Sequence, residues 1–498
     1  MTSELPPGWA LTDIGTLGRY VNGRGFRKDE WKKVGLPIIR IQNLNDESAE
    51  FNYTDQEHES RYRVIDGDLL VAWAASLGVY HWNRGPAWLN QHIFRVEVEE
   101  RAVTKQFLYY TLKHALEALY KKAHGSGMVH ITKGKFDSHP VKLPPLGEQT
   151  RIVSKIDELF SRIDEGERSL ERVQKLVERY RQSVLKAAVT GELTRDWREK
   201  NKDKLERGEA LLVRILKARR EAWEKAELSR LKAKGITPAN DKWKQRYKEP
   251  SRPDIGGLRD LPQGWTWATV EQISTKVVDG VHSKPNYVAS GIPFVTVKNL
   301  TAGPGISFDR LNYITATDHA EFIKRTDPER GDVLISKDGT LGVVRVIRTD
   351  TTFSIFVSVA LVKPVVRTMG EFVGIALSSP VVQAQMVPKG SGLQHIHLED
   401  LRRDCIPLPS LEEQQVIVDL VAAQMVGIDH VEADLAAYTK KTRSLRQSVL
   451  SSAFSGSLAP QSPADEDAAA LLERIASERA DAPAKPKRGR KAKNPELV

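Results

Sequence analysis

One sequence unit occurs twice in this chain of 498 residues, and the duplication limits the folds that the chain can adopt. The first copy contains LPPLGEQTRIVSKIDELFSRID from Leu143, and the second contains LPSLEEQQVIVDLVAAQMVGID from Leu408. Earlier in each copy stands a short motif, LPPGW at Leu5 and LPQGW at Leu261. Because the shared motifs keep one order, we expect two similar halves, each with a globular part, a long helix and a charged extension.

The globular parts are predicted to be mixed α/β. Short runs rich in β-formers, such as residues 37–41 and 293–297, are punctuated by Gly, Asn and Asp. Residues 107–123 have the periodicity of an amphipathic helix, whose counterpart in the second copy is interrupted by Pro380. The copies differ most between their shared motifs. That difference indicates either two domains with different targets or drift in exposed loops.

Each long helix carries an apolar seam whose spacings alternate between four and three residues over about five heptads. The first seam, broken at Gly166, consists of Ile152, Ile156, Leu159, Ile163, Leu170, Val173, Val177, Tyr180 and Val184. The second, with polar Gln424 and Thr442, consists of Ile417, Val421, Ile428, Val431, Leu435, Tyr438, Leu445 and Val449. Such a seam requires a partner helix, so we expect the two helices to pair as a coiled coil. The alternative is that each helix packs on its own domain.

The direction of that pairing decides where the domains lie. Parallel helices would put both domains at one end, whereas antiparallel helices would put one at each end, related by a pseudo-two-fold axis. We predict the antiparallel form. The predicted organisation is a first globular domain (1–146), a first spacer helix (147–194), a charged connector (195–260), a second globular domain (261–410), a second spacer helix (411–459) and a charged, largely disordered tail (460–498).

The formal net charge of +10 suggests a polyanionic partner, but its distribution weakens that inference. Residues 195–260 carry 20 Lys and Arg against 12 Asp and Glu, and residues 484–498 carry 6 against 1. The excess therefore lies in the connector and the tail. A solvated linker explains it as well as a nucleic-acid partner does.

Several classes of protein are disfavoured by what the sequence lacks. No apolar run is long enough for a membrane span, and the first residues do not resemble a signal peptide, so we expect a cytoplasmic protein. The single cysteine, Cys405, is expected to be a packing residue, and no Cys/His cluster has zinc spacing. We find no phosphate-binding loop, no nucleophile elbow and no base-holding motif of an adenine methyltransferase.

The order of the duplicated motifs resembles the specificity (S) subunit of a type I restriction–modification system. The motifs that carry the resemblance are LPPGW/LPQGW, GDLLV/GDVLI, LPPLGEQ/LPSLEEQ, IVSKID/IVDLVA and RQSVLKAAVTGELT/RQSVLSSAFSGSL. Each motif is weak alone, but their duplicated order covers nearly the whole chain. The long insert at 195–260 and the basic tail depart from the core repeat.

The resemblance implies a non-catalytic subunit of a methyltransferase/endonuclease complex. It implies two target-recognition domains that each read one half of a bipartite site in double-stranded DNA, with the paired helices setting the spacing. The expected partners are two methyltransferase (M) subunits and restriction/translocase (R) subunits, which would hold S-adenosylmethionine, ATP and Mg, while this chain binds no cofactor or metal. Non-seam apolar residues such as Val153, Phe160 and Leu185 would dock the M subunits. Two alternatives remain open: a coiled-coil scaffold that binds DNA without reading it, and a DNA-acting enzyme with an unrecognised site.

Candidate DNA contacts follow from the chemistry of base readout, in which Arg and Lys bond guanine and Asn and Gln bond adenine. Each candidate could equally be an ordinary solvated loop residue. The first domain supplies Asn22, Arg24, Arg27, Lys28, His130, Lys133 and Lys135. The second domain supplies His282, Lys284, Lys337, Asp338, Thr340, Gln394 and His395.

Overall fold

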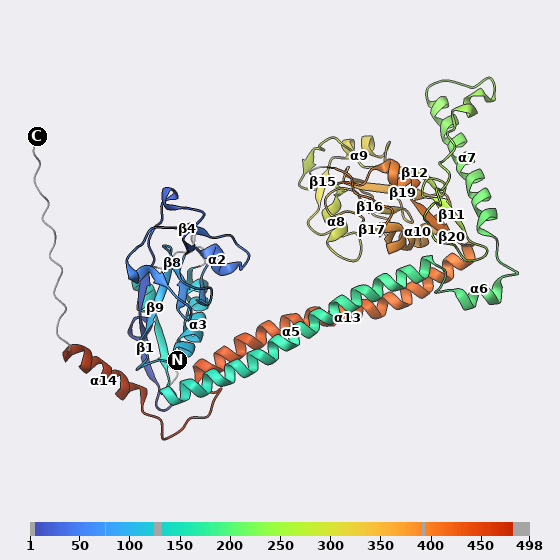
Figure 1. The fold of residues 1–498 in the computed structure, drawn as a ribbon. Coiled ribbons are helices and arrows are strands. Elements are labelled where there is room, and N and C mark those ends of the chain that lie inside the picture. The colour runs from blue at the N-terminus through green and yellow to red at the C-terminus, as the bar shows by residue number, and fades with distance from the viewer. Residues whose placement is uncertain (1–4, 75, 124–131, 391–393, 482–498) are drawn as a thin grey trace, which may run out of the picture. The chain divides into compact units, whose positions relative to one another are not determined.

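The computed structural model describes residues 5–74, 76–123, 132–390 and 394–481. The chain divides into two compact units, one made of Met1–Leu170 with Ala437–Val498 and the other of Glu171–Ala436. Both long helices pass from one unit into the other. Each unit therefore holds one globular α/β domain and one half of each helix, and Figure 1 labels their elements.

The first domain is built on two four-stranded sheets, in the orders β2-β9-β6-β7 and β4-β3-β8-β5. Its remaining strands, β1 and β10, pair with each other. The strands are β1 (Ala10–Asp13), β2 (Gly18–Asn22), β3 (Leu36–Ile39), β4 (Asn52–Thr54), β5 (Arg63–Val64), β6 (Leu69–Ala72), β7 (Gly78–His81), β8 (Ala87–Leu89), β9 (Ile93–Val98) and β10 (Pro140–Leu143). The helices are α1 (Ile14–Leu17), η1 (Lys28–Glu30), α2 (Ile41–Asn45), η2 (Ser60–Tyr62), α3 (Lys105–Ala123) and α4 (Lys133–Asp137).

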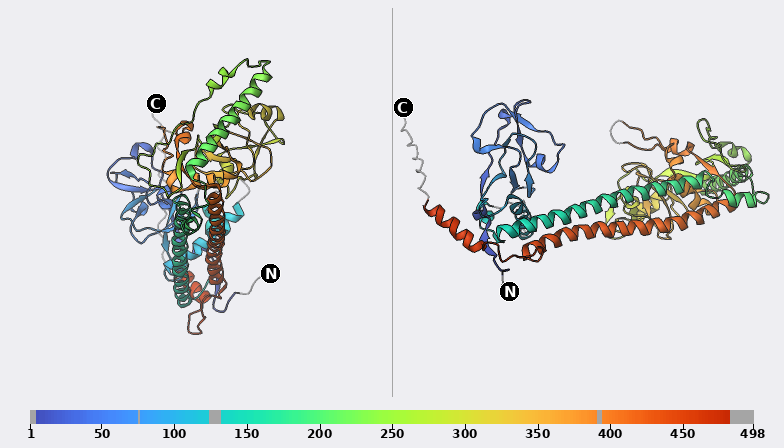
Figure 2. Two further views of the ribbon diagram at one scale, coloured as in Figure 1. Left: turned by 90° about the vertical axis from the view of Figure 1, so that its right-hand side faces the viewer. Right: turned by 60° about the horizontal axis from the view of Figure 1, so that its bottom comes forward.

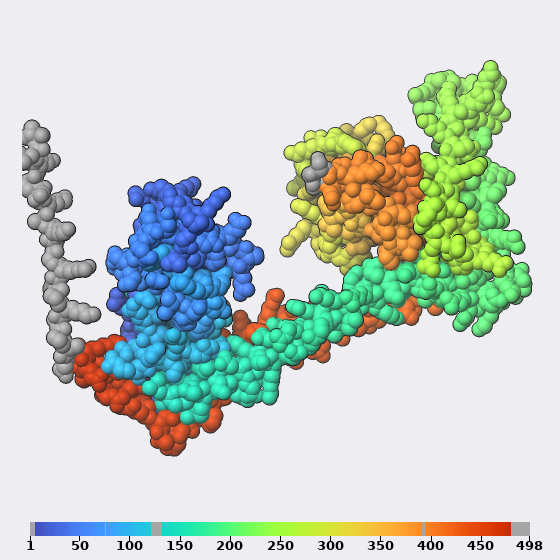
Figure 3. Space-filling view, in the orientation of Figure 1, coloured from blue at the N-terminus to red at the C-terminus, as the bar shows by residue number. Residues whose placement is uncertain are grey.

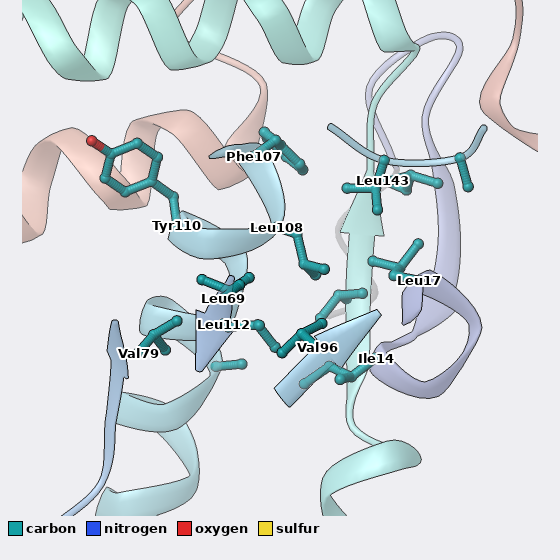
Figure 4. Packing of buried hydrophobic residues seen from close by; sticks show 14 of the residues in the cluster. Ile14, Leu17, Leu69, Val79, Val96, Phe107, Leu108, Tyr110, Leu112 and Leu143 are labelled. Atoms are coloured by element: carbon teal, nitrogen blue, oxygen red, sulfur yellow. The ribbon is translucent and has the colours of Figure 1, made fainter. Parts of the chain in front are cut away.

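Helix α3 closes the main core of the first domain. Leu69 of β6 and Val96 of β9 lie opposite each other in the antiparallel ladder. Leu108 and Leu112, one turn apart on α3, point toward them in Figure 4. These aliphatic side chains are buried, and each contributes roughly 1.5–3 kcal/mol to folding. The sheet and the helix therefore share one hydrophobic core.

The second domain repeats this plan, with sheets in the orders β12-β19-β16-β17 and β13-β15-β14-β18 and a pair β11-β20. The strands are β11 (Thr266–Thr269), β12 (Ser274–Asp279), β13 (Tyr287–Val288), β14 (Ile292–Val295), β15 (Asn312–Ile314), β16 (Val333–Ser336), β17 (Val344–Val346), β18 (Ser354–Ile355), β19 (Val359–Pro364) and β20 (Cys405–Leu408). The helices are α8 (Val297–Thr301), α9 (Ala316–Phe322), η4 (Arg367–Met369), α10 (Gly370–Ser378), α11 (Pro380–Gln383) and α12 (Leu398–Arg403). The expectation of two similar α/β domains is confirmed.

The two long helices are α5 (Leu146–Val189) and α13 (Leu411–Ser455). We expected them to run to residues 194 and 459. They end earlier because Gly191 and Gly456 adopt positive φ values of 72° and 78°, a conformation that terminates a helix and favours glycine.

The two helices are antiparallel, as predicted. In the first unit the early part of α5 lies beside the late part of α13, and in the second unit the late part of α5 lies beside the early part of α13. Figures 1 and 2 show the helices side by side. Ion pairs between α5 and α13 recur at equivalent places in the two units: Arg446 with Asp164 and Glu167, and Arg181 with Asp429 and Glu432.

Burial along the predicted seam varies with position. The buried seam residues are Ile152, Ile156, Val184, Ile417, Val421 and Ile428, and all but Ile428 belong to a core cluster shared with a domain. Half-buried positions are Leu159, Ile163, Leu170, Val177, Leu435 and Val449. The exposed ones are Val173, Tyr180, Val431, Tyr438 and Leu445. Two helices alone enclose a seam poorly, so five of the six buried positions lie where a domain adds a third surface.

The segment 195–260, expected as a charged connector, is structured and belongs to the second unit. It forms α6 (Arg195–Asn201), α7 (Gly208–Ala233) and η3 (Asp241–Arg246). Leu211 and Ile215, one turn apart on α7, enter the core of the second domain. Farther along, Trp223 stacks on Trp243 at 6.1 Å, and this distal part stands away from the domain in Figure 3.

The segment 460–498 was expected to be largely disordered, but its described part folds. Helix α14 (Ala468–Asp481) places Leu471 and Ile475 in the core of the first domain. The extension that follows each long helix therefore packs on the domain of the other copy. The corresponding bonds run from Gly208 N to Gly264 O at 2.7 Å and from Ala468 N to Gly8 O at 3.0 Å. Residues 482–498, with the predicted basic tail, lie outside the described residues.

Candidate nucleic-acid interface

In the second domain, several predicted DNA contacts gather around Asp279, the last residue of β12. Its buried carboxylate pairs with Arg325, and its Oδ2 lies 3.3 Å from His282 Nε2 and 3.5 Å from Lys337 Nζ. Burial would raise the pKa of Asp279, but the hydrogen bond from Arg325 and the neighbouring positive charges lower it below its usual value. The group is therefore a fixed anion that positions Arg325, Lys337 and the ring of His282.

The loop that follows β16 joins the same cluster. Lys337 Nζ also lies 3.6 Å from Asp338 Oδ2, and Asp338 forms a β-bridge with His395. Ile396 N donates to Lys337 O at 2.9 Å. The structure thus brings together His282, Lys337, Asp338 and His395. The other candidates of this domain, Lys284, Thr340 and Gln394, are exposed on the same loops.

In the first domain, the predicted Arg24 is held in a fixed orientation. Its guanidinium contacts Glu30 Oε1 at 2.8 Å and His58 Nδ1 at 2.7 Å, and it lies over the Phe26 ring. The backbone N–H of Arg27 and the Arg24 guanidinium lower the pKa of the buried Glu30 carboxyl. Because Glu30 is an anion, Arg24 is anchored as His282 and Lys337 are in the second domain.

The remaining described candidates of the first domain lie at the end of β2, at η1 and on α4. Asn22 ends β2 and accepts a hydrogen bond from Trp73 Nε1 at 3.2 Å. Arg27 and Lys28 are exposed at η1, and Lys135 is exposed on α4. Lys133 pairs with Asp137 and lies over the Tyr20 ring at 5.9 Å. His130 lies outside the described residues.

Five residues near these clusters were missed from the sequence: Trp73, His92, Asp279, Arg325 and Ser358. Trp73 follows the strand of the repeated GDLLV motif, so its position at a strand end was a usable signal. Asp279 ends β12, which lies between the shared motifs, and no such signal marked it. Arg325 has no counterpart motif in the first copy. Only the folded arrangement shows that it pairs with Asp279.

An open groove of about 1380 Å³ lies in the second unit, between the long helices and the second domain. It is lined by Arg181 of α5, Met425 and Val426 of α13, and Arg345 and Ile375 of the domain. Burial and the nearby Arg181 charge lower the pKa of Arg345. The groove combines apolar helix surface with positive charge, a combination that suits a protein partner better than a small ligand.

The apolar residues expected to dock partner subunits are not the exposed ones. Leu185 is buried, and Val153 and Phe160 pack against the core of the first domain. The most exposed apolar residues of the paired helices are instead Leu176, Val426 and Tyr438, each with more than half of its surface accessible.

The described residues contain no group of three His, Cys, Asp or Glu side chains placed to hold a metal ion. Within the same residues, no helix is both long and apolar enough to cross a membrane. Cys405 is buried in β20.

The two similar α/β domains, each packed beside part of an antiparallel helix pair, define a class of duplicated two-domain proteins. The sequence model of the type I restriction modification DNA specificity domain matches residues 6–175 and 275–423. These segments make up more than half of the chain, and the chain belongs to this family.

Relatives match along nearly the full length. The EcoBI specificity subunit of Escherichia coli is 28% identical, with 95% of this chain and 92% of that protein covered. The EcoKI specificity subunit of E. coli strain K12 is 23% identical, with 96% and 97% covered. A chain in a solved structure that concerns complex assembly and conformational transition of the type I R–M system has a similar fold. Its TM-score is 0.62 at 19% identity, and 91% of this chain and 99% of that chain are covered.

Proposed function

We propose that this chain is the DNA-specificity subunit of a type I restriction–modification complex. It binds double-stranded DNA, and it assembles with methyltransferase and restriction subunits that carry out the chemistry. S-adenosylmethionine, ATP and Mg belong to those partners, and the complex acts in the cytoplasm.

In this proposal each globular domain reads one half of a two-part target, and the helix pair sets the distance between the halves. One observation carries the proposal. Equivalent residues of the two copies, Arg181 and Arg446, form equivalent ion pairs across one antiparallel helix pair. A pair built in this way has matching ends, each next to one recognition domain. A bipartite DNA site has a matching arrangement, because it consists of two separated half-sites in opposite orientations.

The clusters around Arg24 in the first domain and Asp279 in the second are the proposed DNA-facing surfaces. Both hold cationic side chains on buried carboxylates, which fixes donors for base or phosphate contacts at low entropic cost. Their residues differ, as expected if the two half-sites differ in sequence.

Exchange of one domain tests the proposal. Residues 5–142 are replaced by the matching domain of another specificity subunit, and the complex with its methyltransferase subunits is used to methylate genomic DNA. We expect one half-site to change and the other to stay the same. A change in both halves would contradict independent reading. Equal methylation of unrelated sequences would favour a scaffold that binds DNA without reading it.

A further inference from the structure

In each domain two strands of the main sheet end, and a third begins, at one edge of the sheet, and the residues there correspond one to one. In the first domain, Trp73 follows β6 and its N–H donates to the carbonyl of His92, which precedes β9, at 3.2 Å. In the second domain, Lys337 follows β16 and its N–H donates to the carbonyl of Ser358, which precedes β19, at 2.9 Å.

The third strand supplies the third member. Asn22 ends β2 and lies opposite Phe94 of β9, while Asp279 ends β12 and lies opposite Ala360 of β19. The sheet-end triads are therefore Asn22, Trp73 and His92 in the first domain and Asp279, Lys337 and Ser358 in the second.

The first triad fixes the orientation of an amide. The indole N–H of Trp73 can only donate, and it donates to Asn22 Oδ1 at 3.2 Å. Trp73 itself is held by stacking on Phe94 at 5.5 Å. The amide NH₂ group of the exposed Asn22 therefore faces away from the indole, and Oδ1 keeps a second lone pair.

The second triad fixes an ammonium group instead. Lys337 Nζ lies 3.5 Å from Asp279 Oδ2 and 3.6 Å from Asp338 Oδ2. An ammonium has three donors, so two carboxylates leave one free for a further acceptor. The position that presents a donor and an acceptor in the first domain thus presents donors alone in the second.

Both triads contain a buried polar atom that lacks a hydrogen-bond partner among the described residues, namely His92 Nδ1 and Ser358 Oγ. Ser358 is only 7% exposed, and His92 adopts a positive φ of 72° that is uncommon for a residue with a side chain. Such atoms cost stability unless something satisfies them. An ordered water bridging to a bound base would do so at both places.

We propose that the sheet-end triads are the points at which the two domains read different bases, a proposal that rests on the function proposed above. Asn22 forms the two hydrogen bonds that suit the N6 and N7 edge of adenine. The one free N–H of Lys337 donates to O6 or N7 of guanine. Trp73 and Asp279 are positioning residues that orient the reading group.

The test uses the full chain assembled with its methyltransferase subunits, acting on a DNA library in which every base of both half-sites is varied. For Asn22→Ala we expect the preference for adenine at one position of one half-site to fall by roughly ten- to a hundredfold. The other half-site should stay unchanged. Lys337→Ala should produce the equivalent loss for guanine, in the opposite half-site only.

Two further variants guard against loss of folding. Asn22→Asp keeps the acceptor for Trp73 and should shift the preference toward cytosine, whose N4 group donates. Arg19→Ala, at the other end of β2 with its side chain 70% exposed, is the matched control and should change nothing.

The proposal is overturned if the Asn22 and Lys337 variants keep the wild-type preference at every position, or if they lower methylation of all sequences equally. The base preferences of the wild-type complex distinguish failure of the triad assignment from failure of the proposed function. If the wild-type complex prefers two separated half-sites while the variants behave like wild type, only the assignment of the triads fails.

Discussion

The indole Nε1 of Trp9 donates a hydrogen bond to the buried carboxylate of Glu148 at 3.0 Å, across 139 residues of sequence. The same bond joins Trp265 to Glu413 at 2.8 Å in the second unit. Each bond ties the first motif of a copy, LPPGW or LPQGW, to the first turn of the long helix that follows it. Both helices therefore leave their domains from an equivalent anchor.

The two anchors differ in their remaining contacts. Glu413 Oε1 also accepts from Thr194 Oγ1 and from Arg198, both at 2.7 Å, whereas Glu148 Oε1 has no partner among the described residues. We expect Glu413→Gln to lower the free energy of unfolding of the second unit by about 2–3 kcal/mol, because it leaves Arg198 without its carboxylate. Glu148→Gln should change that of the first unit by less than about 1 kcal/mol. Urea unfolding measures both, and equal costs would contradict this account.

Asp404 gives the second unit a dependence on pH. Burial, helped by the charge of Asp400, raises the pKa of Asp404 to about 7. A carboxyl whose pKa is raised on folding stabilises the fold at low pH, and this stability is lost as the pH rises from about 4 to 7. Asp404→Asn should therefore stabilise the protein at pH 8, by about 1–3 kcal/mol. Near pH 4 it should have little effect. Denaturation at both pH values checks this, and a variant that is no more stable at pH 8 would refute it.

The equivalent ion pairs between α5 and α13 should have equal strengths. Double-mutant cycles on Arg446 with Glu167 and on Arg181 with Glu432 should each give a coupling energy of about 0.5–1 kcal/mol, since both pairs are partly exposed. The control is Arg162 with Glu158, a pair within α5, whose loss should not weaken the contact between the helices. Coupling in only one of the two cycles would show that the ends of the helix pair are not equivalent.

In place of Val153, Phe160 and Leu185, we propose that the exposed apolar residues Leu176 and Val426 of the paired helices dock the methyltransferase subunits. Leu176→Asp and Val426→Asp should each weaken assembly on the order of tenfold, while thermal unfolding of the free chain stays unchanged. Val213→Asp is the matched control, because Val213 is 68% exposed but lies on α7. Assembly is followed by titration of the methyltransferase subunits. The docking assignment is wrong if Val213→Asp weakens assembly as much as the other two substitutions do.

Periodicity and repetition made the helices predictable. The seam from Ile152 to Val184 marked α5 to within a few residues, and only the glycine that ends each helix was misjudged. The repeated RQSVL motif contained both Arg181 and Arg446. Their acidic partners could not be recognised, because the register between two antiparallel helices is set by packing along their whole length.

Contacts between strands that are distant in the sequence could not be predicted from it. Asn22 was chosen for its chemistry, but its bond to Trp73 depends on the pairing of β2 and β6 with β9, which no local pattern encodes. The echo between ALLVRI in α7 and ALLERI in α14 was visible as a repeat. The domain on which each helix packs was not visible: α7 packs on the second domain, which is near it in sequence, but α14 packs on the first domain, which is far from it.

The most direct test of the central claim shortens the helix pair by one heptad. Deleting residues 170–176 and 435–441 together keeps the antiparallel register. It also removes none of the residues in the interhelical ion pairs. Each helix loses about 10 Å, which corresponds to about three base pairs of B-DNA.

The measurement is methylation by the assembled complex of substrates that carry both half-sites at every spacing. The account predicts the same half-sites with a preferred spacer about three base pairs shorter. A folded deletion protein that still methylates the original spacing with undiminished efficiency would contradict the claim that the helices set the distance.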